Sequence, residues 1–100
     1  MMNKRFKLLA RVSSSDPEGV RLILQRMITK GSVRKEGDEF IIEAEMEGGS
    51  AKELNRSLLS ALRMAEKKTR LRAEWTSDDG TTQKFFDYVL KKTTKTGPSS

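Results

Sequence analysis

The side chains of this sequence that could do chemistry are its cations, because the residue types that most often perform catalysis are missing. The 100 residues include no histidine and no cysteine, whereas lysine and arginine number 20 against 14 acids. Histidine is the commonest general base and metal ligand, and structural zinc sites and thiol nucleophiles need cysteine. We therefore expect a chain that is not an enzyme, with no catalytic residue, no metal and no cofactor.

The excess of positive charge, formally +6 with a pI near 9.8, favours a polyanionic partner. RNA or DNA fits such a charge better than a membrane surface does. A generally solvated, charge-rich surface is the alternative that composition alone leaves open.

One segment collects cations at helical spacing: SAKELNRSLLSALRMAEKK, residues 50–68. At 100° per residue, six of its apolar residues fall within an arc of roughly 100° that would face a core: Ala51, Leu54, Leu58, Ala61, Leu62 and Ala65. A nearly opposite arc of roughly 80° holds four cations and Ser60 but no acid. We expect this basic stripe to contact RNA phosphates, which gives affinity without sequence reading, although a solvated face or a protein-contact face is the alternative. The stripe consists of Lys52, Arg56, Arg63 and Lys67, with Lys68 and Arg70 continuing the charge beyond it.

Two apolar residues, Leu9 and Ile41, occupy positions that alternate outward from a sheet. They could centre a subunit contact in a homodimer, or they could be ordinary exposed apolar residues. The outward positions of the three best strands include no aromatic residue, so a base-stacking platform is not expected there. Trp75 alternates with the inward set and is expected in the core.

Alternation of apolar and polar residues predicts the strands. The pattern is clearest over 5–12, 39–46 and 69–75, and a shorter strand over 32–36 precedes the turn EGDE. Residues 81–90, TTQKFFDYVL, follow the turn SDDGT and are predicted as a fifth strand. A terminal helix is the rival interpretation of that segment, because its apolar residues also fit helical spacing.

Two capping boxes mark the starts of helices. Ser15 with Glu18 opens a helix that continues to about Lys30, and Ser50 with Glu53 opens the helix that carries the basic stripe. The resulting order, β-α-β-β-α-β-β, is that of an α+β fold. We expect a two-layer ferredoxin-like sandwich, in which an antiparallel sheet carries both helices on one face.

Length and composition fit a single domain over 1–92, followed by a disordered polar tail over 93–100. No run approaches the roughly 18 consecutive apolar residues of a membrane span, and the first residues do not read as a signal peptide. The absence of cysteine fits the cytoplasm.

Residues 5–68 resemble the small dimerising subunit of the KEOPS complex, which supports threonylcarbamoyl modification of tRNA in archaea and eukaryotes. The resemblance consists of the β-α-β-β-α order, the charged hairpin VRKEGDEFIIEAEME, and the helix SAKELNRSLLSALRM with Asn55. It implies a noncatalytic scaffold that dimerises, binds a kinase-like carbamoyltransferase and helps to hold tRNA.

A shorter motif, SDPEGVRLI, resembles the turn before the first helix of ligand-sensing ACT domains. That resemblance implies a small ligand at a dimer interface, although helix capping accounts for the same residues. The sequence therefore favours a noncatalytic, RNA-associated accessory module with a tRNA-like partner. The alternatives are a protein-interaction or dimerisation module and an ACT-like regulatory domain.

Overall fold

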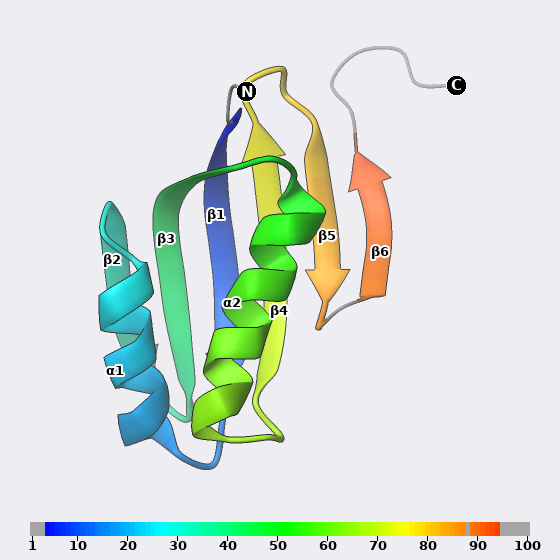
Figure 1. Ribbon diagram of the computed structural model, residues 1–100. Helices are drawn as coiled ribbons and strands as arrows, with labels where there is room; N and C mark the ends of the chain where they lie inside the picture. The colour runs from blue at the N-terminus through cyan, green and yellow to red at the C-terminus, as the bar shows by residue number, and fades with distance from the viewer. Residues whose placement is uncertain (1–3, 88, 95–100) are drawn as a thin grey trace.

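The computed structural model describes residues 4–87 and 89–94, and over these residues the chain forms two helices and six strands. The strands form one antiparallel sheet in the order β2-β3-β1-β4-β5-β6, and both helices lie on the same face of it (Figure 1). This confirms the predicted two-layer α+β sandwich of the ferredoxin-like kind. The elements are β1 (Lys4–Ser13), α1 (Pro17–Met27), β2 (Gly31–Glu36), β3 (Glu39–Gly48), α2 (Ala51–Ala65), β4 (Arg70–Ser77), β5 (Thr82–Phe86) and β6 (Val89–Thr94).

The first strand, β1, lies at the centre of the sheet, paired with β3 on one side and β4 on the other. Its predicted alternation is confirmed, because Phe6, Leu8, Ala10 and Val12 are buried and the residues between them are exposed. The register pairs Leu8 with Ala44 of β3 and with Trp75 of β4, so the buried residues of the three strands form one surface.

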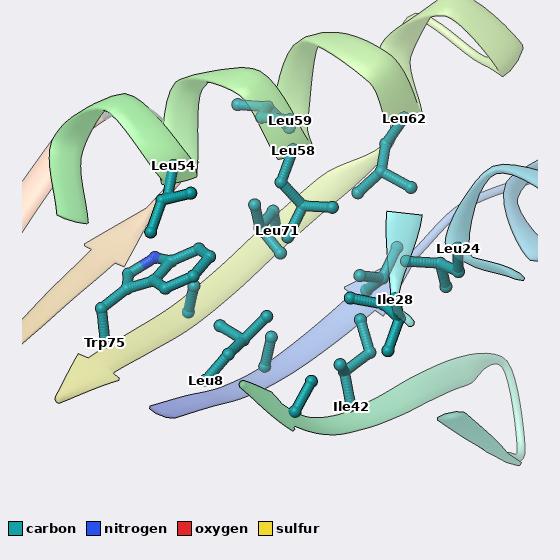
Figure 2. Packing of buried hydrophobic residues seen from close by; sticks show 14 of the residues in the cluster. Leu8, Leu24, Ile28, Ile42, Leu54, Leu58, Leu59, Leu62, Leu71 and Trp75 are labelled. Carbon is teal, nitrogen blue, oxygen red and sulfur yellow. The ribbon is translucent and has the colours of Figure 1, made fainter. Parts of the chain in front are cut away.

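The core lies between that surface and the two helices. Figure 2 shows Leu54, Leu58 and Leu62 extending from α2 toward the sheet, with Leu24 extending from α1. Trp75 is fully buried, as expected. Leu59, which the helical arc placed outside the core face, is also fully buried, whereas Ala61 is only half-buried. The buried face of α2 therefore extends further toward Asn55 and Leu59 than the predicted arc does.

The helix boundaries differ from the predicted ones. The first helix is capped by Asp16, whose carboxylate accepts the Gly19 N–H at 3.2 Å, and not by Ser15. The second helix begins as predicted, because the Ser50 hydroxyl accepts the Glu53 N–H at 3.1 Å. Capping by Asp16 accounts for the DPEG turn without a ligand. Both helices end three residues early: α1 at residue 27, followed by an extended residue 28, and α2 at residue 65.

The segment 81–90 is neither a single strand nor a terminal helix. It forms β5, a turn at Asp87, and the start of β6, which pairs back on β5. Asp87 has a φ of 58°, a left-handed conformation that reverses the chain and that aspartate tolerates better than most residues. The preceding turn lies where the sequence predicts it, and its Gly80 has a φ of 87°. Thr93 and Thr94, assigned to the tail from the sequence, belong to β6, and residues 95–100 lie outside the described residues.

Neither described helix is long and apolar enough to cross a membrane.

Candidate nucleic-acid interface

The structure divides the predicted basic stripe and its extension. Lys52 and Arg56 are exposed on α2, one helical turn apart. Lys67 and Lys68 are also exposed, but they lie in the turn after α2, because the helix ends at residue 65. Arg70 begins β4 and is exposed on the sheet. The cations therefore do not form the continuous helical surface that a 100° step predicts.

An acid is part of the turn that holds Lys67 and Lys68. The carboxylate of Glu66 accepts the backbone N–H of Lys68 at 2.8 Å and the Ser14 hydroxyl at 3.4 Å. The first of these hydrogen bonds is the main cause of a lowered pKa of Glu66, so this carboxylate is negatively charged at neutral pH. A phosphate beside Lys68 would meet that charge, which makes the turn a poorer anion site than its two lysines suggest.

Arg63 is engaged in contacts within the protein. Its Nε donates a hydrogen bond to the backbone oxygen of Thr69 at 3.0 Å, and a terminal nitrogen lies 3.5 Å from Oδ1 of Asp87. Its side chain is 33% exposed. These contacts join α2 to the start of β4 and to the turn between β5 and β6. They give Arg63 a structural role, and we leave it out of the proposed interface.

The same turn carries a buried polar network, here called the Asp87 hub and made of Asn55, Arg63, Leu71, Trp75 and Asp87. The amide of Asn55 donates to the Asp87 carbonyl at 2.6 Å and accepts the indole N–H of Trp75 at 3.2 Å. Two hydrogen bonds join Asp87 to the backbone of Leu71. The Leu71 N–H donates to the Asp87 carboxylate at 2.9 Å, and the Asp87 N–H donates to the Leu71 carbonyl at 2.6 Å. Asn55 is 1% exposed, so its amide holds the β5–β6 turn against the core.

Lys52 and Arg56 lie on the rim of a groove between α2 and β5, here called the α2–β5 groove. Its volume is about 340 Å³, and it is lined by Lys52, Asn55, Arg56, Ser60 and Phe85. Phe85 is buried on the helical face of the sheet. In Figure 1, β5 and β6 lie beyond α2, on the side of this helix away from α1. Among the described residues, the lining includes two cations and no carboxylate.

The opposite side of the sheet, here called the outer face, faces away from both described helices (Figure 1). Leu9 is 53% exposed there, and Ile41 is half-buried. The two residues line one shallow groove of about 500 Å³, so the structure brings the predicted subunit-contact residues together. Phe86 lines the same groove. The three strands considered in the sequence analysis contribute no aromatic residue to this face, but β5, which that count did not include, contributes Phe86.

Phe86 lies between arginines on this face. It is directly opposite Arg72 in the register of β4 and β5, and the Arg72 guanidinium lies 4.8 Å from its ring centroid. The guanidinium of Arg70 lies 5.9 Å from the same centroid. Both distances are within the range of cation–π attraction. The helical periodicity of residues 50–68 carried no signal of this cluster, which depends on strand pairing.

Charge divides the outer face into halves. Its β3 side carries Glu43 and Glu45, whereas its β4 and β5 side carries Arg70, Arg72 and Lys84 with one acid, Glu74. Glu74 lies directly opposite Lys84 in the register, so its charge is offset by a cation of similar exposure. The positive half is the half that contains Phe86.

Comparisons with protein-family models, curated proteins and solved structures found no match for this chain. The described residues include no group of three or more histidine, cysteine, aspartate or glutamate side chains placed to hold a metal ion.

Proposed function

We propose that this chain is a noncatalytic accessory module that binds RNA through backbone phosphates at the α2–β5 groove. The observation that carries the proposal is the exposed pair Lys52 and Arg56 on the rim of a groove with no described acid in its lining. Cations at i and i+4 on a helix have Cβ atoms about 5–6 Å apart, so both can contact one strand of a nucleic acid. Such contacts give affinity that depends on salt and not on sequence.

The structure of α2 supports a functional reading of this pair. A helix gains stability when acids and bases alternate at i and i+4, and Lys52 followed by Arg56 has the opposite, slightly unfavourable arrangement. Arg63, on the same helix, has acidic and carbonyl partners within the protein. Lys52 and Arg56 instead flank a groove, where a polyanion would relieve their mutual repulsion.

The class of RNA follows from the resemblance of residues 5–68 to the small KEOPS subunit, which implies a scaffold that helps to hold tRNA. Asn55, one of the residues that carry this resemblance, belongs to the Asp87 hub and also lines the α2–β5 groove. We therefore propose a tRNA-like partner, and a place for the module beside a separate enzyme that acts on that RNA.

The test is the binding of total tRNA across a salt series, followed by fluorescence anisotropy. The variant Lys52→Glu/Arg56→Glu removes both groove cations. Its matched control, Arg21→Glu/Arg26→Glu, makes the same charge change on the exposed side of α1. Each lost phosphate contact should reduce the magnitude of the slope of log K against log salt by about 0.7–0.9. The groove variant lacks two such contacts, so the magnitude of its slope should be smaller than that of the wild type by about 1.4–1.8.

The control variant should keep most of the wild-type slope. If the slope fell equally in the two variants, the loss would be an effect of net charge, and the groove would not be the binding site. Failure of the wild type to bind tRNA at low salt would refute RNA binding altogether. Far-ultraviolet circular dichroism checks that both variants keep the fold.

The second candidate is a protein-interaction or dimerisation module, favoured by the exposed Leu9 beside Ile41 on the outer face. Sedimentation of the wild type at low and high salt separates the two functions. A homodimer that persists in high salt, together with no salt-dependent affinity for tRNA, would support this candidate over the first.

A further inference from the structure

The positive half of the outer face combines features that match a particular kind of RNA. It offers an aromatic ring, Phe86, and a planar guanidinium, Arg72, on one open surface. Nucleobases stack on aromatic rings and on guanidinium planes. We propose that this half of the outer face binds an unpaired base of a single-stranded RNA segment, stacked on Phe86 and Arg72. The inference rests on the proposed RNA-binding function and extends it to a second surface.

The groove is large enough for a nucleoside and is open for one to enter. Its volume of about 500 Å³ lies within the range of roughly 300–1,000 Å³ that is typical of small-ligand sites. Leu9, Arg11 and Phe86 contribute to its lining. Phe86 is half-buried, and the Arg72 guanidinium lies over its ring. A base that stacked on the exposed part of this pair would cover surface that is now in contact with water, which adds a sequence-tolerant contribution to affinity.

The position of Phe86 is fixed by its neighbours along the chain. The next residue, Asp87, is held by the Asn55 amide and by two hydrogen bonds to the Leu71 backbone. Phe86 itself is paired with Arg72 in the β4–β5 ladder. A ring attached to such a constrained segment loses little further freedom on binding, which favours a binding role over a flexible surface position.

Charge selects the occupant of this groove. The guanidinium groups of Arg70 and Arg72 lie over the ring. The groove is also lined by Lys84, by the acid opposite it, Glu74, and by Arg11, which is 3.1 Å from Glu39. A ligand that suits this surface carries negative charge beside flat rings, and a single-stranded RNA has both. A duplex has the charge, but its bases are stacked on each other and cannot lie flat on Phe86.

A second copy of the chain is the competing occupant, because Leu9 and Ile41 lie in the same groove. In a homodimer formed through this groove, Phe86, Arg70 and Arg72 would contact the outer face of a second copy of the chain. Of the acids on this face, Glu74 already lies opposite Lys84, and Glu43 and Glu45 are on the β3 half, away from the ring. Single-stranded RNA complements the ring and the arginines together, and for this reason we favour it.

The experiment compares a labelled oligouridine with the same strand paired to oligoadenosine. The variants are Phe86→Leu, which keeps an apolar side chain, and Arg72→Lys, which keeps the charge but not the plane. Leu22→Ala is the matched control, because it shortens an exposed leucine of α1 that lies outside this groove. Loss of base stacking should weaken oligouridine binding by about 5- to 150-fold in Phe86→Leu.

The proposal predicts that Phe86→Leu and Arg72→Lys both weaken oligouridine binding and leave duplex binding unchanged, whereas Leu22→Ala affects neither. Equal affinity of wild type and Phe86→Leu for oligouridine would overturn it. So would a homodimer that Phe86→Leu and Leu9→Ala both dissociate with no change in RNA binding. Thermal unfolding of each variant shows whether a loss of RNA binding is caused by misfolding. Arg72 is exposed, so Arg72→Lys tests the site without changing the half-buried Phe86.

The two proposals can fail separately. If Lys52→Glu/Arg56→Glu loses its affinity for the duplex while Phe86→Leu binds oligouridine normally, only the base site is refuted. If the wild type binds neither probe at low salt, RNA binding itself fails and the base site fails with it.

Discussion

The Asp87 hub makes a quantitative prediction about Asn55, because this one amide satisfies two buried groups at once. Replacing Asn55 by leucine keeps a side chain of similar size and removes both hydrogen bonds. The indole N–H of Trp75 and the carbonyl of Asp87 would then have no partner from this position. Each buried group left unsatisfied costs about 1–3 kcal/mol.

Burial of the leucine side chain offsets part of that cost, by at most about 1.5–3 kcal/mol. We therefore expect Asn55→Leu to lower the free energy of unfolding by about 2 kcal/mol. That is a large fraction of the 5–15 kcal/mol that typically stabilises a domain of this kind.

Urea denaturation followed by far-ultraviolet circular dichroism measures this change, and Trp75→Phe supplies the internal control. In the Trp75→Phe background the indole N–H no longer exists, so Asn55→Leu should cost about 1–2 kcal/mol less than it does in the wild type. If Asn55→Leu shifts stability by less than about 0.5 kcal/mol, as an ordinary surface change does, the amide does not hold the hub. An unchanged cost in the Trp75→Phe background would likewise contradict the assigned hydrogen bond.

Two further predictions concern charged groups whose roles differ in the folded state. Arg63→Gln should destabilise the protein by about 1–2 kcal/mol, because it removes contacts to Thr69 and Asp87, whereas Arg56→Gln should stay within about 0.5 kcal/mol in the same urea titration. Equal effects would mean that Arg63 is not structural. The Ser77 hydroxyl and then the Thr81 N–H lower the pKa of Asp79 from 3.8 to about 2. Because the folded-state pKa is depressed, this carboxylate stabilises the fold fully above pH 4 and loses its contribution as the pH falls toward 2. Urea midpoints measured between those pH values should therefore depend on pH less steeply in Asp79→Asn than in the wild type.

The sequence was informative about the fold wherever a pattern is local. Apolar residues alternate along β1, β3 and β4 with a period of two, and every one of these strands was placed correctly to within a few residues. The Ser50 cap of α2 was also foreseen, because its hydrogen bond spans only three residues. At the start of α1 two capping residues adjoin, and nothing local decides between Ser15 and Asp16.

The candidate site depends on contacts between distant segments, and there the sequence was misleading. The helical arc predicts that every cation on that side of α2 points into solvent. Arg63 instead forms an ion pair with Asp87, which lies in the β5–β6 turn. Glu66, at the C-cap of α2, accepts a hydrogen bond from the hydroxyl of Ser14, which lies 52 residues earlier in the chain. Phe86 became an outer-face residue only because β5 is a separate strand paired with β4. None of these contacts has a periodic signal.

The central position of β1 has a consequence for the way this protein is made. β1 is synthesised before the other described strands of the sheet. One of its edges can pair with β3 early, but the other edge has no partner until β4, whose residues follow α2, has been made. At about 5–20 residues per second on the ribosome, that edge is open for several seconds. An unpaired edge beside buried residues such as Leu8 is a template for aggregation. Chains interrupted between α2 and β4 should therefore accumulate as aggregates or be degraded, and a chaperone that shields nascent strands should improve the yield of the complete protein.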